Sequence, residues 1–296
     1  MASTEKGRRR RGRLLLIGGN EDMDERDMRI LPVLVQHAGG ADARILICGA
    51  ASSNPRPTLE AFQKVFEKIG VGEVHCSELN SRDEANGDEL CNMLERCTGV
   101  FFTGGDQLRI TSLMAGTRFG KRVQDRHTRD GLLVAGTSAG AAAASSTMII
   151  RGIGDTVKRE AVELAPGLGY LRDITVDTHF DRGGRVHRLM TVLAQNPATL
   201  GIGIDSDTAV DLAPNGKFTV LGRGVVMVFD GRDTHTNAAE VRGHEAIALT
   251  DLRLHVLAAK YGFDLRSRTP IAPAVERVVG GVTSWRGSGA AGQFDR

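Results

Sequence analysis

Leu132-Leu133-Val134-Ala135-Gly136-Thr137-Ser138-Ala139-Gly140, followed by four alanines at 141–144, is the stretch that decides the fold of this 296-residue chain. The order predicts a buried strand, a sharp turn with a serine at its apex, and a helix. Glycines flank the serine because side chains there would collide in so tight a turn. A G-x-S-x-G turn in this setting is a nucleophile elbow, so we expect Ser138 to stand above the sheet edge.

Apolar strands and helical segments alternate through the first half of the chain. Leu14–Ile17 leads into Gly18-Gly19-Asn20, and residues 99–102 lead into Gly104-Gly105-Asp106-Gln107. These strands are continuously apolar, which predicts an α/β fold with a mostly parallel sheet and helices on both faces. Ligands bind beyond the carboxyl ends of such strands, so we expect both loops to meet Ser138 at one crevice.

The second half changes character. Residues 174–176 form an apolar strand that ends at Asp177-Thr178-His179-Phe180. Residues 218–221 and 225–229, split by Gly222-Arg223-Gly224, predict a hairpin, and residues 250–261 predict a late helix. We see no clean linker, so we expect one hydrolytic domain over residues 14–278, with a disordered basic arm at 1–13 and a flexible tail at 279–296.

Composition narrows the class of protein. Hydrophobic residues make up 41% of the chain, which allows a sizeable core. No apolar run approaches the roughly 20 residues of a membrane span, and no apolar signal region follows the basic N-terminus. The four cysteines form no C-x-x-C pair, so we expect a cytoplasmic protein with reduced thiols and no structural metal.

The net charge of +2 is unevenly distributed. Residues 1–13 contain six Lys or Arg and one Glu, so the rest of the chain carries −3. A short basic run of this kind is usually a solvated tail. We therefore expect no nucleic-acid or membrane partner.

Ser138 needs a general base, because a neutral hydroxyl is a poor nucleophile near pH 7. Among eight histidines, His179 stands out because it directly follows an apolar strand. Arg185 and Arg188 lie three residues apart on a predicted helix, so they share a face and could bind a substrate carboxylate together.

A third group should orient His179 and stabilise its charged form. The apolar segment 201–204 is followed by Asp205, Ser206 and Asp207. Alternation along an extended chain would point the two carboxylates to one side and Ser206 to the other. Either Asp205 or Asp207 could serve as the acid.

With these pieces placed, the chain from about Leu14 to Leu265 resembles the cyanophycinase group of peptidase family S51, which includes aspartyl dipeptidase. The resemblance is carried by Gly18-Gly19, Gly104-Gly105-Asp106-Gln107, the Ser138 elbow, Asp177-Thr178-His179-Phe180 and residues 201–205. It implies a three-layer α/β/α sandwich like the class I glutamine amidotransferases. It also implies a cytoplasmic homodimer that needs no cofactor.

The resemblance further implies a reaction and its residues. Cyanophycinases cut an aspartate polymer that bears arginines, releasing β-Asp-Arg dipeptides. Ser138 would be the nucleophile and His179 the base, and Gly105 and Ala139 would donate N–H groups to the oxyanion. Substrate-binding positions would be Gln107, Asp177, Arg185 and Arg188.

Three departures from the family pattern leave the activity open. Thr178 replaces a glutamine, Gly183 stands where an arginine is expected, and the family's catalytic glutamate falls on Ser206. The first hypothesis is a serine hydrolase of the cyanophycinase type. A second is a dipeptidase or transferase acting on aspartyl or isoaspartyl compounds. The third is a catalytically weakened binding protein on the same scaffold.

Overall fold

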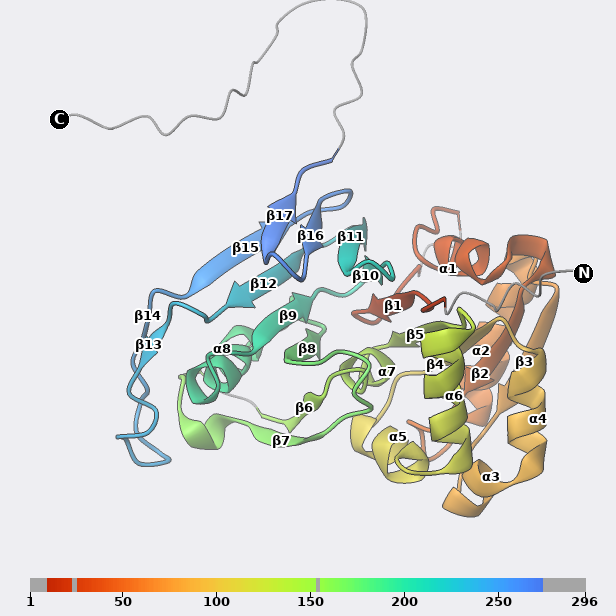
Figure 1. The fold of residues 1–296 in the computed structure, drawn as a ribbon, viewed down its shortest axis with the longest axis horizontal. Coiled ribbons are helices and arrows are strands. Elements are labelled where there is room, and N and C mark those ends of the chain that lie inside the picture. The colour runs from red at the N-terminus through yellow and green to blue at the C-terminus, as the bar shows by residue number, and fades with distance from the viewer. Residues whose placement is uncertain (1–9, 23–25, 153–154, 274–296) are drawn as a thin grey trace, which may run out of the picture.

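A computed structural model describes residues 10–22, 26–152 and 155–273 of the chain. A nine-stranded sheet runs through the molecule in the order β17-β16-β11-β10-β1-β5-β4-β2-β3 (Figure 1). The strands are β1 (Leu14–Ile17), β2 (Arg44–Cys48), β3 (Glu73–Ser77), β4 (Gly99–Phe102), β5 (Leu133–Thr137), β10 (Thr208–Leu212), β11 (Lys217–Gly222), β16 (Gly262–Asp264) and β17 (Thr269–Ile271).

The strands β1, β5, β4, β2 and β3 pair in parallel. Alternate residues of these strands feed two separate hydrophobic cores, one on each face of the sheet. One core includes α1 (Leu31–Ala38) and α2 (Arg56–Ile69). The other includes α3 (Arg82–Asn86), α4 (Asp88–Arg96), α5 (Gln107–Met114), α6 (Arg118–Arg129) and α7 (Ala139–Ala142). The predicted α/β fold with helices on both faces is thereby confirmed.

A second, four-stranded sheet has the order β15-β12-β9-β8 and lies at the left of Figure 1. It packs into the same core as the helices α3 to α7. Its strands are β8 (Ile174–Thr178), β9 (Leu200–Ile204), β12 (Val226–Asp230) and β15 (Arg253–Leu257), and α8 (Arg185–Gln195) packs against it. Short elements complete the fold: β6 (Thr147–Arg151), β7 (Glu163–Pro166), β13 (His235–Thr236), β14 (Leu249–Thr250) and the 3₁₀ turns η1 (Gly40–Asp42) and η2 (Arg159–Ala161).

Two predicted elements are wrong. The segments expected to form a hairpin are β11 and β12, but β11 pairs with β10 and β16, whereas β12 pairs with β9 and β15. The chain crosses from one sheet to the other between them. The expected helix at 250–261 is largely β15, whose Leu254 and Val256 are 49% and 56% exposed.

The large sheet combines parallel and antiparallel pairs. The five strands β1, β5, β4, β2 and β3 are parallel, whereas β10, β11, β16 and β17 extend the sheet beyond β1 through antiparallel pairs.

Residues 10–13, which the sequence assigns to a disordered arm, contact the folded body. Arg10 and Gly12 donate backbone hydrogen bonds to Arg129 and His127 at the end of α6, at 2.9 and 2.6 Å. Arg13 binds the Asp211 carboxylate on β10 at 2.8 Å. Residues 10–13 are therefore part of the folded body, while residues 1–9 and the predicted tail at 279–296 lie outside the described residues.

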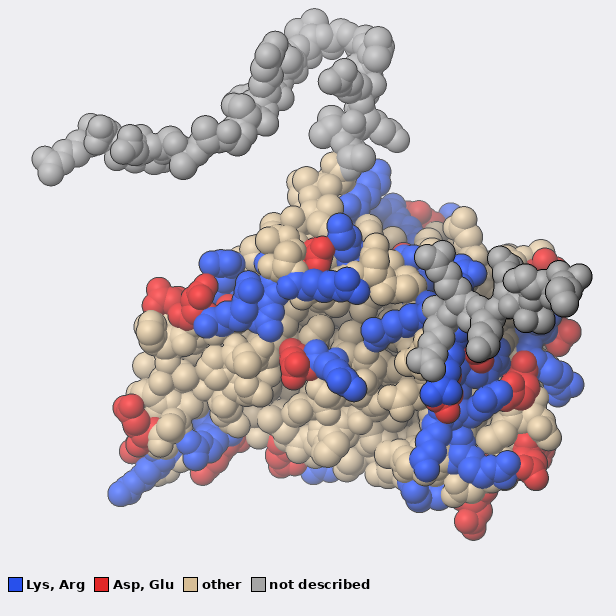
Figure 2. All heavy atoms as spheres, in the orientation of Figure 1, with Lys and Arg blue, Asp and Glu red and all other residues tan. Residues whose placement is uncertain are grey.

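Basic and acidic side chains are interspersed on the face shown in Figure 2. On α6, Arg118 pairs with Asp88 of α4 at 2.7 Å, and Arg122 pairs with Glu95. The charge of this arginine-rich helix is thus partly neutralised within the protein. In the described ranges, no helix is long and apolar enough to cross a membrane.

Candidate active site

Ser138 lies at the end of β5, in the strained turn that the sequence predicts. Its φ of 52° and ψ of −109° are unusual for a residue with a side chain. A Cβ at Gly136 would lie 2.4 Å from the carbonyl carbon of Gly140, and a Cβ at Gly140 would lie 2.4 Å from the carbonyl oxygen of Phe102. Only glycine fits at either position, so the close packing of the turn holds the Ser138 hydroxyl at the sheet edge.

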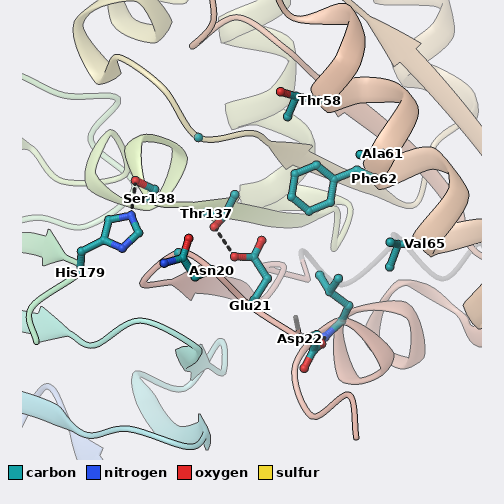
Figure 3. A pocket seen from close by; sticks show the side chains of 13 residues that line it. Asn20, Glu21, Asp22, Thr58, Ala61, Phe62, Val65, Thr137, Ser138 and His179 are labelled. Carbon is teal, nitrogen blue, oxygen red and sulfur yellow. Dashed lines mark hydrogen bonds between the residues drawn. The ribbon is translucent and has the colours of Figure 1, made fainter. Parts of the chain in front are cut away.

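His179 follows β8 and meets Ser138 across the cleft (Figure 3). Its Nε2 atom lies 3.1 Å from the Ser138 Oγ atom. Its backbone N–H donates to the Gly18 carbonyl at 2.9 Å, which ties the histidine loop to the loop after β1. A Cβ at Gly19 would lie 2.2 Å from the His179 ring, so a glycine is required beside the imidazole.

The other ring nitrogen of His179 leads to an acid through a hydroxyl. Nδ1 lies 3.1 Å from Ser206 Oγ, and that hydroxyl donates to Asp181 Oδ1 at 2.9 Å. Since Ser206 gives its proton to a carboxylate, it accepts the proton that Nδ1 carries. This assignment leaves the Nε2 lone pair facing Ser138, which is the tautomer a general base requires.

Neither predicted acid contacts His179. Asp205 accepts a hydrogen bond from the Val225 N–H at 3.0 Å. Asp207 binds Arg223 at 2.5 Å and accepts the Asp22 N–H at 2.9 Å. The alternation expected of an extended chain does not hold, because residues 205–207 turn after β9 and Asp207 has a φ of 50°. Ser206 is the residue whose side chain contacts the histidine. The sequence does not single out Asp181 as the acid, although it lies two residues after His179 in the same loop.

The charges around His179 favour its neutral form. Burial lowers the pKa of His179, and the positive charges of Arg182 and Arg185 lower it further, against the opposing effect of Asp181 and Asp177. Burial alone would raise the pKa of Asp181, but hydrogen bonds from the Ser206 N–H and hydroxyl outweigh it and lower the pKa. Asp181 is therefore ionised, and His179 is ready to accept a proton near pH 7.

Three of the four predicted substrate-binding residues bind one another. Asp177 is 2% exposed and accepts bonds from Arg185 at 3.2 Å and from Arg188 Nε at 2.6 Å. The two arginines thus share a buried carboxylate of the protein, rather than both facing a ligand as we expected. The Gln107 side chain donates to the Ile149 carbonyl at 2.6 Å. A role of these four residues in substrate binding stays a prediction.

Of the two predicted oxyanion donors, Ala139 lies next to the serine, and the role of both stays a prediction. Ala139 is the first residue of α7 and directly follows Ser138. Gly104 lines the cleft, and Gly105 turns with a φ of 142° against the Ala51 carbonyl. A cavity of about 560 Å³ opens beside the serine. It is lined by Gly19, Asn20, Glu21, Asp22, Leu31, Thr58, Ala61, Phe62, Val65, Gly104, Thr137, Ser138 and His179.

Comparison with known proteins decides the family. The sequence profile of peptidase family S51 matches residues 14–220. The chain belongs to peptidase family S51. A cyanophycinase of Synechococcus elongatus is 38% identical over 259 residues, covering 87% of this chain and 80% of that protein. A cyanophycinase of Trichormus variabilis is 37% identical over 267 residues, covering 90% and 89%.

A solved structure agrees with this membership at the level of the fold. The crystal structure of a peptidase from an acI-B1 Actinobacterium has a TM-score of 0.64 and 18% identity, and the match covers 87% of this chain and 98% of that one. The S51 peptidase described here is accordingly a serine-type peptidase of the cyanophycinase-like kind, as the resemblance predicts.

Proposed function

We propose that this S51 peptidase hydrolyses cyanophycin, the arginine-bearing aspartate polymer, to β-Asp-Arg dipeptides. The similarity to cyanophycinases over about nine-tenths of the chain supports this substrate. The observation that carries the chemistry is the 3.1 Å contact between Ser138 Oγ and His179 Nε2. It joins a half-buried hydroxyl on a strained turn to an imidazole that is held in the tautomer of a base.

In the proposed reaction, Ser138 Oγ attacks the amide carbonyl carbon while its proton passes to His179 Nε2. The carbonyl oxygen becomes an oxyanion, toward which the N–H groups of Ala139 and Gly105 would point. When the C–N bond breaks, the imidazolium returns its proton to the leaving amine. Water then attacks the acyl-enzyme and gives a proton to His179; as the ester C–O bond breaks, the imidazolium returns that proton to Ser138 Oγ.

Ser206 and Asp181 together would take the part of the family's catalytic glutamate. The imidazolium formed during the attack gains a hydrogen bond to Ser206, whose hydroxyl is polarised by the Asp181 carboxylate. The Asp181 charge therefore reaches the His179 ring through the Ser206 hydroxyl, whereas a glutamate in this place would bind the ring directly. This arrangement favours an active enzyme over a binding protein without catalysis.

Hydrolysis of purified cyanophycin tests the function. The wild-type protein should release β-Asp-Arg, and Ser138→Ala should lower the rate by at least roughly 10³-fold. Ser112→Ala, an exposed serine on α5, is the matched control and should leave the rate unchanged. Faster cleavage of α-Asp or isoaspartyl dipeptides than of polymer would favour the dipeptidase alternative, for which Thr178 and Gly183 are the motivating departures. An unmodified protein inert on every substrate would support the binding protein.

We also propose a cytoplasmic homodimer. The family resemblance supports a dimer, as do the exposed apolar side chains of Leu254 and Val256 on β15, a strand that pairs on one side with β12. Light scattering of the purified protein tests this directly: a mass of one chain would reject it.

A further inference from the structure

Glu21 is a buried carboxylate with one unsatisfied oxygen. The residue is 9% exposed, and its Oε2 atom accepts the Thr137 hydroxyl proton at 2.7 Å. Its Oε1 atom is buried and has no hydrogen-bond partner. A buried polar atom without a partner costs about 1–3 kcal/mol, so such an atom beside an active site calls for an explanation.

The position of Glu21 ties it to the reaction centre. Its partner, Thr137, directly precedes Ser138, so their Cα atoms are roughly 3.8 Å apart. Glu21 lines the same cavity as Ser138 and His179. Figure 3 shows it between that pair and the side chains of Phe62 and Val65 on α2. A substrate group that enters the cavity beside Ser138 therefore passes the Glu21 carboxyl group.

The charges lining this cavity are acidic. Among the described residues that line it, none is Lys or Arg. The Asp22 carboxylate is already satisfied by the N–H groups of Arg29, Ile30 and Leu31 at 2.6 to 3.3 Å. Glu21 is thus the acidic lining residue with an open hydrogen-bonding position. Burial raises the pKa of Glu21, the Thr137 bond partly offsets this, and the charge of Asp22 raises it again.

The opposite wall of the cavity is apolar. Phe62, Val65 and Leu31 line it with Glu21. An arginine side chain matches this combination, because its methylene stem packs against apolar surface while its guanidinium donates to a carboxylate. An aromatic ring beside the guanidinium adds a cation–π contribution.

We propose that Glu21 is the specificity residue that receives the guanidinium of a substrate arginine in this cavity. The inference rests on the proposed function, because it assigns a subsite to that substrate. A small rotation of the Glu21 side chain brings Oε1 to the guanidinium, while Oε2 keeps the Thr137 hydroxyl. The guanidinium supplies both the missing donor and the positive charge that stabilises the carboxylate.

The competing account gives Glu21 a structural role. In that case the carboxyl group stays protonated, binds Thr137 and supports the β1 and β5 loops without touching substrate. The two accounts predict different rates of hydrolysis for a substrate in which an uncharged side chain of the same shape replaces arginine. Citrulline has nearly the shape of arginine but carries no charge.

The test compares β-Asp-Arg oligomers with matched oligomers in which citrulline replaces arginine. The wild-type protein should hydrolyse the arginine series with a kcat/KM about 10- to 100-fold higher. Glu21→Gln keeps an acceptor for Thr137, and it should reduce that preference to within a few-fold, mainly by raising KM for the arginine series. Glu60→Gln, an exposed carboxylate on α2, is the matched control and should keep the full preference.

The outcomes separate the two proposals. Cleavage of both series at equal rates by the wild-type protein overturns the Glu21 subsite but leaves the hydrolase intact, even if Glu21→Gln does not fold. An unchanged preference in a folded Glu21→Gln variant overturns it as well. Failure of the wild-type protein to cleave the arginine series removes the proposed function, and the subsite is rejected together with it.

Discussion

Asp181 accepts two hydrogen bonds from Ser206, one from the hydroxyl at 2.9 Å and one from the backbone N–H at 2.8 Å. The second bond fixes where the carboxylate sits, and the first orients the hydroxyl that faces His179. A serine in place of the family's glutamate is therefore compatible with a charged group behind the base. We propose that the loop that carries the histidine supplies this acid.

Replacing Asp181 should slow catalysis without unfolding the protein. Asp181→Asn keeps an oxygen that accepts from Ser206 but removes the charge. Since Asp181 is exposed, we expect kcat to fall roughly tenfold, corresponding to about 1.5 kcal/mol, well short of the ~10⁴ seen when a buried triad acid is lost. Steady-state kinetics on cyanophycin measure this. A larger loss in Asp205→Asn than in Asp181→Asn would show that the wrong carboxylate has been assigned.

A glutamate at position 206 should rescue that variant. In the double variant Asp181→Asn/Ser206→Glu, the new carboxylate can reach His179 Nδ1 directly, and no second charge repels it. We expect its kcat to recover at least to the wild-type value. The same kinetic assay checks this, with Ser206→Ala as the variant that has neither group and should be slower than Asp181→Asn. No recovery in the double variant would mean that charge behind His179 does not limit the reaction.

The pH profile should report His179. The base works only when it is neutral, so kcat/KM should rise with pH through a midpoint below the ordinary 6.5 and be flat by neutrality. Arg182 lowers the pKa of His179, so Arg182→Gln should move the midpoint to higher pH. Asp181 raises that pKa, so Asp181→Asn should move the midpoint to lower pH. Shifts in the opposite directions would exclude His179 as the titrating group.

Asp211 should stabilise the fold in a pH-dependent way. Burial raises its pKa, but bonds from His37 at 3.0 Å and from Arg13 at 2.8 Å outweigh this and lower it. The stabilisation is therefore fully present above the unfolded pKa of 3.8 and is lost as pH falls through the lower folded value.

Urea denaturation at pH 7 and pH 3 measures this effect. Asp211→Asn should lower the free energy of unfolding by about 1.5–3 kcal/mol at pH 7, and the difference should narrow at pH 3. Lys217→Gln, which removes a 3.7 Å contact to Asp264 at the surface, should change it by no more than about 0.5 kcal/mol. A difference that widens toward pH 3 would contradict a lowered pKa of Asp211 in the folded protein.

The sequence predicts the elements that local rules control. The glycine-flanked turn at Ser138 and the strand before His179 each follow from short-range sterics and burial. Because the carboxyl ends of parallel strands lie at one edge of a sheet, the sequence also predicts that the loops after them meet there. The role of Asp181 was not predicted, because it depends on how the loop after β8 folds onto Ser206. The periodicity of apolar residues does not predict the conformation of such a loop. The strand β15 was mistaken for a helix because Leu252 and Val256, four residues apart, fit the helical period, although Leu252, Leu254 and Val256 also alternate as in a strand.

Trapping the covalent intermediate tests the central claim most directly. Cyanophycin turnover is quenched in acid within milliseconds to seconds, and the protein is digested and analysed by mass spectrometry. We predict that the peptide containing Ser138 carries an ester adduct, joined through an aspartyl carbonyl that still bears its arginine, and that Ser138→Ala carries none. Steady turnover with no adduct on Ser138, and undiminished turnover by Ser138→Ala, would contradict the account.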